Sequence, residues 1–479
     1  MKNIDYSHRF VLRATIEFTT PFHIGAGWGG DIADATFVTD ANGLPAIPGS
    51  SLAGVFREAF RNAYKDETSE NRIFGYQAAD QGQGSRLTIS WACIHDQENR
   101  PVEGILSSQC FNDPVLACAR NPSVRDHVRI NLKGASDSHE RGKFDENAVC
   151  CGHRFSFEME LTGNKDDETA WERLLALFGD PALRLGGKTR RGFGAFKIIR
   201  IQAHVFDLKC DFEAYRSHPI SLSQSSPVLE NASLTSSADM TALKFIFHIT
   251  PTGYWMFGGG DDRPIDPGEA KIAPIRDNRI IWKGDKGSVE KDILIIPASG
   301  IKGALSHRVA FHYNALSGIF ADKIQSQDQS IFVNENNRAV RELFGYSKGH
   351  KTKDQTKEEG SRGHIIFDDI YLTPDSSLQL IHHVGIDRFT GGARDQVLFT
   401  ERPIWKGQEL ILVLHVTEPQ AITDSKVKKA LALTLNDLIQ ERLQVGSGNG
   451  RGEGFFSGHI ECSPEASRWL SESSDSLNK

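Results

Sequence analysis

Acidic side chains stand directly behind a glycine-rich run in the stretch FHIGAGWGGDIADATFVTD, near the start of the 479-residue chain. Gly25, Gly27 and Gly30 have the G-x-G-x-x-G spacing of a dinucleotide-binding turn. That turn needs a helix directly after its last glycine, because the helix N-terminus holds the pyrophosphate. Here the chain passes instead through Asp31 and Asp34, without helical spacing of apolar residues until the later IPGSSL segment. The pattern argues against a dinucleotide site and indicates an acidic loop.

Two interpretations of this loop stay open from its residues alone. Asp34 could hold a hydrated Mg²⁺, because Mg²⁺ often takes only one or two protein carboxylates together with phosphate oxygens. It could instead be a turn residue whose carboxylate accepts hydrogen bonds from nearby backbone amides. The spacing by itself favours the turn residue.

A second glycine-rich segment, LRLGGKTRRGFG, carries Lys188, Arg190 and Arg191, and the late segment VGSGNGRGEG retains Arg451 at the corresponding place. Glycine lets backbone amides approach a phosphate closely, and the cations attract it. The alternative is a helix-to-strand turn whose charges are merely solvated. Because the Arg-Gly pair recurs, phosphate contact is favoured, although neither segment has the GxxxxGK[ST] order of a P-loop. The glycines predicted to form phosphate-binding loops are Gly25, Gly27, Gly186, Gly187, Gly192, Gly194, Gly446, Gly450 and Gly452.

A group of possible zinc ligands occurs in the first half of the chain, namely Cys110, Cys118, Cys150, Cys151 and His153. Their spacing lacks the C-x₂-C pairing of structural zinc sites, so the sequence favours buried or surface thiols without a metal. Seven cysteines, an odd and sparse number for this length, also argue against a disulfide framework. A reducing cytoplasm is therefore expected.

The overall charge is acidic, with a formal net charge of -7 and a pI near 6.2. Such a balance is not typical of a nucleic-acid-binding protein. However, the phosphate field is felt only over a Debye length of about 8–10 Å, so a basic groove can coexist with an acidic exterior. The N-terminus lacks a signal-peptide core, and no apolar run approaches the length of a membrane span. We therefore expect no membrane partner.

Sequence blocks recur in the same order in both halves of the chain. The strand patterns FVLRATIEF and LKFIFHIT are each followed by a glycine-rich turn, then by IPGSSL or IPASGI opening a helix, then by FGY and GSR. An amphipathic helix and the glycine segments described above close each half. This order indicates an internal duplication. Each copy reads β-α-β-β-α-β, so the predicted fold is α+β with two tandem ferredoxin-like domains, helices on one sheet face and the other face open for single-stranded RNA.

The domain boundaries follow from the repeat and from composition. The first domain is predicted at 1–205 and the second at 242–462. The intervening 206–241 is rich in serine and poor in large apolar residues, which is typical of a linker. The last segment, 463–479, reads as a polar tail, although Trp469 could dock.

The order strand–GxG–loop–Asp–IPGSSL–helix–FG, closed by the late Arg-Gly loop, resembles the RAMP superfamily. It is similar in particular to the backbone subunits of type III CRISPR effector complexes, and the tandem arrangement resembles the two-repeat subunit of type III-D. The most specific matches are Ile47–Leu52 and His383–Phe399, and the resemblance covers nearly the whole chain. It implies two α+β RAMP domains with β-hairpin thumbs, one at His383–Phe399 and a less recognisable counterpart at Arg129–Ala148.

The resemblance also implies a function and partners. Such subunits polymerise along a guide CRISPR RNA, hold its phosphates and push a thumb through the guide–target duplex at regular intervals. The expected partners are the guide, the target RNA, the large subunit and further RAMP backbone subunits. RNA contacts are thereby assigned to His23, Ser50, Ser51, Arg57, Lys188, Arg190, Arg191, Lys302, Arg308, Arg388 and Arg451, with a packing role equally open for the histidine.

Asp34 falls on the position of the family's target-RNA nuclease residue, whereas Asp31 lies one step off the pattern. The resemblance therefore implies that Asp34 holds Mg²⁺ or another divalent cation and that the RNA's own 2′-hydroxyl attacks. The alternatives are a purely structural backbone subunit and a metal-independent guide-processing RAMP endonuclease.

The second repeat departs from this pattern. Lys271 or Ile272 stands where the first copy has Asp34, and Met256 replaces His23. We therefore expect the second repeat to bind RNA without cutting it. The residues that would rescue activity, if the longer second loop folds back, are Asp261, Asp262 and Asp266.

Overall fold

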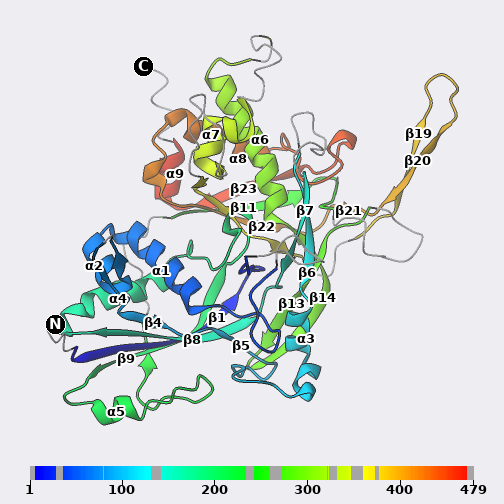
Figure 1. The fold of residues 1–479 in the computed structure, drawn as a ribbon. Coiled ribbons are helices and arrows are strands. Elements are labelled where there is room, and N and C mark those ends of the chain that lie inside the picture. Colours follow the sequence, from blue (N-terminus) through cyan, green and yellow to red (C-terminus); the bar gives the residue numbers. More distant parts are fainter. Residues whose placement is uncertain are drawn as a thin grey trace.

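The computed structural model describes residues 6–27, 36–78, 80–130, 142–233, 242–258, 272–320, 322, 332–346, 360–372 and 377–471. In these ranges the chain forms two mixed α+β repeats that follow one another in sequence and pack against each other (Figure 1). Asp31, Asp34, Asp261, Asp262, Asp266 and Lys271 lie outside the described residues, as does Gly30.

The first repeat is built on an antiparallel sheet whose strands run in the order β10-β9-β1-β8-β4, with β5 also paired to β8. The strands are β1 (His8–Phe18), β2 (Tyr76–Gln77), β3 (Gly82–Gln83), β4 (Leu87–Ile89), β5 (Cys93–Ile94), β6 (Ser123–Val128), β7 (Lys143–Ala148), β8 (Arg154–Gly163), β9 (Phe196–Asp207) and β10 (Glu230–Asn231). The helices are α1 (Gly49–Tyr64), α2 (Glu67–Phe74), α3 (Pro114–Arg120), α4 (Glu168–Ala176) and α5 (Phe212–Arg216).

One face of this sheet carries the core. The alternating apolar residues of β1 meet Leu52 and Phe56 of α1, Ile73 of α2 and Trp171 of α4. The alternation is what the sequence predicted for a half-buried strand. Helices α1, α2 and α4 therefore cover the same side of the sheet (Figure 1).

The opposite face of the first sheet is covered as well, which differs from the open face expected from the sequence. Phe206 of β9 packs with Val11 and Leu229, and Arg13 donates hydrogen bonds to Glu158 (2.6 Å) and to the Gln224 carbonyl (2.7 Å). The covering chain is the serine-rich segment, which forms α5 and the edge strand β10. A few apolar contacts are thus enough to pack the serine-rich segment against the sheet, although its composition predicts a linker.

The second repeat has the corresponding sheet, in the order β17-β22-β11-β23. Its strands are β11 (Leu243–Pro251), β12 (Tyr254–Trp255), β13 (Arg276–Lys283), β14 (Lys286–Ile296), β15 (Gly345–Tyr346), β16 (Ser361–Arg362), β17 (Ile365–Phe367), β18 (Ile370–Tyr371), β19 (Ile381–Ile386), β20 (Ala393–Glu401), β21 (Ile404–Trp405), β22 (Leu410–Val416) and β23 (Phe456–Cys462). Its helices are α6 (Ala298–Leu316), α7 (Arg338–Phe344), α8 (Ser425–Ile439) and α9 (Pro464–Ser471).

The two sheets correspond strand by strand. β11, β17, β22 and β23 take the places of β1, β4, β8 and β9, and all of their pairings are antiparallel. Helix α9 packs the Trp469 ring against the second core, and its Nε1 donates to the Pro419 carbonyl (3.1 Å). The start of the predicted polar tail is therefore docked rather than loose.

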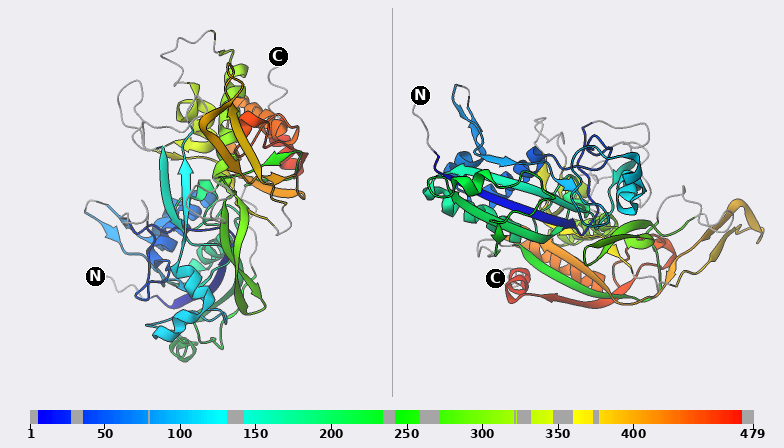
Figure 2. Two further views of the ribbon diagram at one scale, coloured as in Figure 1. Left: turned by 90° about the vertical axis from the view of Figure 1, so that its right-hand side faces the viewer. Right: turned by 90° about the horizontal axis from the view of Figure 1, so that it is seen from below.

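A β-hairpin extends from each repeat. The predicted thumb of the second repeat forms β19–β20, which projects away from the body (Figures 1 and 2). In the first repeat the hairpin is β6–β7, so its first strand begins before the predicted start at Arg129. This first hairpin contacts β13 of the second repeat, because Arg125 Nη2 of β6 donates to Asp277 Oδ2 (2.6 Å).

A buried ion cluster joins the first hairpin to the second repeat. Arg125 of β6, with only 4% of its side chain exposed, bonds to Asp277 of β13 (2.6 Å) and to Asp369. Asp369 also accepts a hydrogen bond from the Ala298 amide at the start of α6 (2.8 Å). Burial, together with weaker repulsion from Asp277, raises the pKa of Asp369. The arginine therefore compensates carboxylates that could not be buried alone.

The first glycine loop packs into the same place. Gly192 adopts φ +97°, and a Cβ there would lie 2.5 Å from the Ala298 Cβ and 2.7 Å from Asp369 Oδ1. The Arg125 guanidinium lies 5.2 Å from the ring centre of Phe193. The glycine loop of the first repeat thus contacts the start of α6 in the second, and the hairpin base is connected to the same place through Asp369.

Breaking the buried cluster should destabilise the chain strongly. We expect Arg125→Met to lower the free energy of unfolding by about 3–5 kcal/mol, because Asp277 and Asp369 would be left buried and uncompensated. Denaturant unfolding measures the loss. As a matched control, Arg100→Met removes a surface i,i+4 pair with Asp96 and should change stability by about 0.5 kcal/mol or less.

Adding Asp277→Asn to the Arg125→Met variant should recover part of the loss, since it removes one uncompensated charge. Equal costs for Arg125→Met and Arg100→Met would contradict the structural importance of the cluster.

Candidate nucleic-acid interface

The acidic loop of the first repeat has well-defined ends. Gly25 and Phe37 form an antiparallel bridge, the Ala26 amide donates to the Thr36 carbonyl (2.9 Å) and the Val38 amide to Ile24 (2.8 Å). The loop that contains Asp31 and Asp34 is therefore closed at its base like a hairpin. The roles of these aspartates remain predictions.

His23 lies at this base and is only 4% exposed. Its Nδ1 lies 2.8 Å from the Asn147 carbonyl, next to the end of β7. Burial lowers the pKa of His23 below its usual value. This position fits the packing role that the sequence left open, and direct RNA contact stays a prediction.

The two glycine loops have equivalent backbone hydrogen bonds. The Gly187 amide donates to the His23 carbonyl (2.8 Å), and the Ser447 amide donates to Met256 (2.7 Å). Gly186 has φ +90°, and a Cβ there would lie 2.5 Å from the His23 carbonyl oxygen. Close backbone approach therefore explains this glycine without a phosphate. The predicted loop glycines with positive φ are Gly27, Gly186, Gly192, Gly194, Gly446 and Gly452, whereas Gly25, Gly187 and Gly450 have ordinary φ values.

Cations from both repeats converge where the first glycine loop meets α6. Burial, followed by the nearby Arg191, lowers the pKa of Lys188 to about 8, although its ammonium pairs with Glu146. Burial, followed by Arg191 and Arg190, lowers the pKa of Lys302 on α6 to about 8. Burial also lowers the pKa of Arg190 to about 10. Mutually repelling, half-buried cations of this kind favour a bound anion.

A buried glutamate connects the first glycine loop to the hairpin β6–β7 of the same repeat. Glu146 of β7 pairs with Lys188 and lies 2.9 Å from His127 Nε2. The His127 ring stacks on the Phe144 ring with 5.0 Å between centroids, and the Arg191 guanidinium lies 5.0 Å from the Phe144 centroid. Burial, helped by Arg191, lowers the pKa of His127 to about 4, so the neutral imidazole donates a hydrogen bond to Glu146.

The second repeat has the same arrangement. Glu401 of β20, which is fully buried, bonds to His383 Nε2 (2.6 Å) and to Arg451 (2.5 Å). His383 stacks on Phe399 at 4.7 Å, and Arg451 lies 5.7 Å from the same ring. Neither Glu146 nor Glu401 is among the site residues predicted from the sequence. A usable signal existed, because each follows a strand phenylalanine that pairs with a histidine on the neighbouring strand.

The other residues predicted to contact RNA lie on several different elements. Ser50 is exposed and Ser51 half-buried at the start of α1. Arg57 Nε is bonded to Glu70 (2.6 Å) and Arg308 Nε to Asp437 (2.6 Å), so both guanidinium groups brace helices within their own repeat. Arg388 is exposed in the turn between β19 and β20, the hairpin that projects away from the body (Figure 1).

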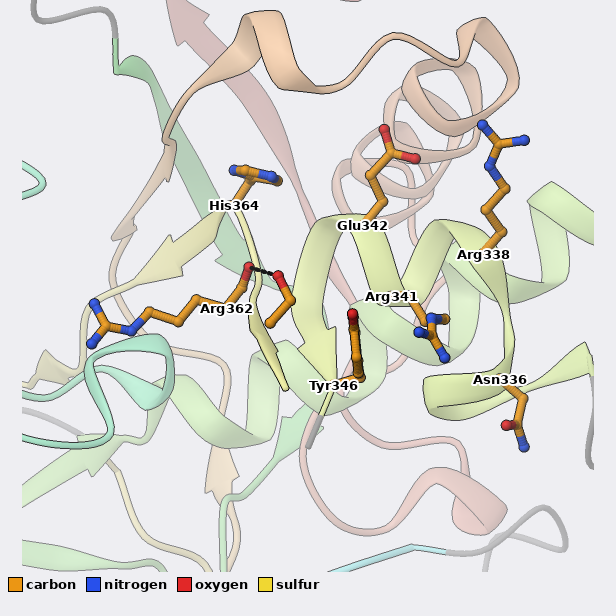
Figure 3. A pocket seen from close by; sticks show the side chains of 8 residues that line it. Asn336, Arg338, Arg341, Glu342, Tyr346, Arg362 and His364 are labelled. Carbon is orange, nitrogen blue, oxygen red and sulfur yellow. Dashed lines mark hydrogen bonds between the residues drawn. The ribbon is translucent and has the colours of Figure 1, made fainter. Parts of the chain in front are cut away.

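An open hollow of about 550 Å³ lies beside α7 and β16 (Figure 3). Its arginines are engaged within the protein. Arg341 stacks 3.9 Å from the Tyr346 centroid, Arg362 bonds to Glu58 of the first repeat (2.7 Å) and Arg338 pairs with Asp424 (3.3 Å). We assign no ligand to this hollow. Its lining residues are Asn336, Arg338, Arg341, Glu342, Tyr346, Ser361, Arg362 and His364.

The cysteine-rich region brings together three possible metal ligands that are distant in sequence. Cys118, Cys150 and His153 come together although their spacing showed no zinc motif. Cys110 is exposed, and Cys151 is buried with its pKa raised to about 12 by burial. The hairpin β6–β7 separates Cys118 from Cys150 in sequence, so a rule based on short spacing cannot detect their proximity.

Comparison with known families supports the duplication and the resemblance. The RAMP superfamily model matches residues 15–197 and again residues 249–457. The chain belongs to the RAMP superfamily. Membership suggests a CRISPR-associated RNA-binding protein. No curated protein matches the chain. Among the described helices of this RAMP protein, none is both long and apolar enough to cross a membrane.

The convergence of cations can be tested through the titration of the lysines. We expect a small amine-reactive reagent to label Lys188 and Lys302 at half of the maximal rate near pH 8. For an unperturbed lysine the half-maximal rate would be reached at about pH 10.4. Arg191→Gln should raise both midpoints, because it removes a nearby like charge. Peptide mass spectrometry after labelling at a series of pH values measures this. Arg388→Gln, in the hairpin turn, is the matched control, and equal midpoints in both variants would contradict the convergence.

Proposed function

We propose that this RAMP protein is a backbone subunit of a type III CRISPR effector complex that acts in the cytoplasm. It would bind the guide RNA and the guide–target duplex through sequence-independent phosphate contacts. It would also cleave bound target RNA through its first repeat. Each repeat would have the ferredoxin-like β-α-β-β-α-β fold, in agreement with the matching strand orders of the two sheets.

The observation that carries the proposal is the convergence of Lys188, Arg190 and Arg191 with Lys302 at the junction of the repeats. These cations are partly desolvated, and like charges lower the pKa of Lys188 and Lys302. A phosphate diester would compensate the charge without any base-specific contact. The junction would then hold the guide backbone where it passes from one repeat to the next.

The hairpins support the polymeric arrangement. The first hairpin is held against the second repeat through Arg125, whereas β19–β20 projects into solvent. Its exposed apolar residues include Phe389, which is 98% exposed, and Ile386, which is 63% exposed. We propose that a neighbouring RAMP subunit or the guide–target duplex covers this second hairpin in the complex.

Asp34 is the proposed catalytic residue and holder of Mg²⁺. The donor set of the loop fits this ion, because Asp31 and Asp34 offer hard carboxylate oxygens and the loop base is fixed by the Gly25–Phe37 bridge. When bound, a divalent cation would supply stabilisation of the negative charge that develops on phosphate and leaving-group oxygens. Asp34 would favour deprotonation of the RNA 2′-hydroxyl, which DNA lacks.

The second repeat is proposed to bind RNA without cutting it. Ile272, one of the residues that the sequence places opposite Asp34, is paired by its amide with the Thr400 carbonyl (3.2 Å) and has no ionisable group. Met256 occupies the position of His23 at the glycine loop. Asp261, Asp262 and Asp266 remain the candidates for activity in this repeat.

Loss of a junction cation should weaken RNA binding equally for unrelated sequences. We expect Lys302→Gln to reduce the slope of log affinity against log salt concentration by about 0.7, the value for one contact with a single strand. Wild-type affinity should also fall as the pH rises from 7 to 9, because Lys302 loses its charge near pH 8. Lys302→Arg should lose less affinity than the wild type between pH 7 and pH 9, since arginine stays charged while Lys188 still titrates near pH 8.

Fluorescence anisotropy with several RNAs measures these affinities, and the exposed Lys165→Gln is the control. Sequence-selective losses, or equal effects of Lys302→Gln and Lys165→Gln, would rule out the phosphate assignment.

Substitution of Asp34 should separate cleavage from binding. In the assembled complex supplied with matched target RNA and Mg²⁺, Asp34→Asn should slow one specific cut by about 10²–10⁴-fold while the guide still copurifies. Asp80→Asn, which removes an exposed carboxylate outside the acidic loop, is the control and should leave the cleavage ladder unchanged. Gel analysis of end-labelled target measures both.

An unchanged ladder in Asp34→Asn would support a non-catalytic scaffold subunit. Cleavage of the guide precursor that persists in EDTA would support a metal-independent processing enzyme instead. Absence of any copurified RNA would contradict the binding assignment itself.

A further inference from the structure

Possible soft-metal ligands meet close to the junction of the repeats. Within the described ranges, the ligating atoms of Cys118, Cys150 and His153 all lie within 4.8 Å of one another. Cys118 lies on α3, Cys150 is the second residue after β7, and His153 directly precedes β8. The two sulfurs are 3.6 Å apart, and Cys150 Sγ is 3.6 Å from His153 Nε2. Both cysteines are free thiols rather than a disulfide.

The Cys118–Cys150 and Cys150–His153 separations match a tetrahedral zinc site. With Zn–S bonds near 2.3 Å and Zn–N bonds near 2.0–2.1 Å, tetrahedral geometry places two sulfurs about 3.8 Å apart and a sulfur about 3.6 Å from a nitrogen. Within these two pairs the atoms would have to move only by tenths of an ångström to coordinate an ion. Cys118 and His153 offer atoms that lie within 4.8 Å of each other.

The donor types favour zinc over the magnesium proposed for the acidic loop. Two thiolates and an imidazole are soft or intermediate ligands, which suit Zn²⁺ and are poor ligands for Mg²⁺. His153 is fully buried. Its Nε2 contacts a thiol, which is a weak hydrogen-bonding partner. A metal–nitrogen bond would stabilise this imidazole far better.

The surroundings of the cluster connect it to the second repeat. Val115 and Ile280 pack around Cys150, with Trp282 beside them, so the ligands have an apolar shell. The turn that carries Cys150 and His153 receives the second repeat directly. Trp282 Nε1 donates to the Gly152 carbonyl (2.7 Å), and the Ile280 amide donates to Cys151 (2.9 Å).

We propose that Cys118, Cys150 and His153 bind one Zn²⁺, with water as the fourth ligand, and that the ion fixes the turn on which β13 of the second repeat docks. The two thiols release their protons when the ion binds. The site is separate from Asp34 and does not depend on the proposed RNA cleavage.

Elemental analysis of the purified full-length protein tests the proposal. We expect about one zinc ion per chain, lost in the double variant Cys118→Ser/Cys150→Ser. Cys210→Ser removes an exposed thiol and is the matched control, which should keep its zinc. Hydrogen exchange at 276–289 should rise in the double variant, since the docking turn would be less ordered, and stay unchanged in the control.

Wild-type protein provides a second readout that does not require the variants to fold. Replacing the metal with Co²⁺ should produce thiolate-to-cobalt charge-transfer absorption and the intense visible bands of tetrahedral cobalt. Zinc absent from the purified protein together with no cobalt absorption would overturn the proposal. A disulfide between Cys118 and Cys150, detected by mass spectrometry after alkylation, would overturn it as well.

Discussion

Arg125 is a desolvated cation held between Asp277 and Asp369 of the other repeat, and the union of the two halves depends on this balance of charge. Neither carboxylate could be buried without it, and the guanidinium could not be buried without them. Asp369 also caps the start of α6 through the Ala298 amide. The same side chain therefore orients the helix that carries Lys302, so the cationic junction depends on this cluster.

The junction explains how an acidic protein can provide an anion-binding surface. The net charge of -7 describes the chain as a whole, whereas Lys188, Arg190, Arg191 and Lys302 are brought together from separate segments. Buried glutamates at the hairpin bases, Glu146 among them, fix the cations that contact them. Each glycine loop is consequently tied to the hairpin of its own repeat, so movement of a hairpin would displace the cations beside it.

The duplicated fold was largely predictable because both copies use the same local patterns. Alternating apolar residues predicted β1 and β11, and the recurring glycine loops and hairpin β19–β20 lie where the sequence predicted them. The covered face of the first sheet was missed, because Leu229 and a few other anchors are inconspicuous in a serine-rich segment. The Arg125 cluster and the meeting of Cys118 with Cys150 were also missed, since both depend on tertiary proximity across long stretches of chain.

Gly192 illustrates that the residue types allowed in one repeat depend on the residues present in the other. Its missing side chain leaves the space that Ala298 and Asp369 of the other copy fill. A larger residue at any of these positions would have to be accommodated by a compensating change in the opposite half. At the contact between the two repeats, a substitution in one repeat therefore requires a matching substitution in the other. The sequences of the two repeats are coupled at these positions.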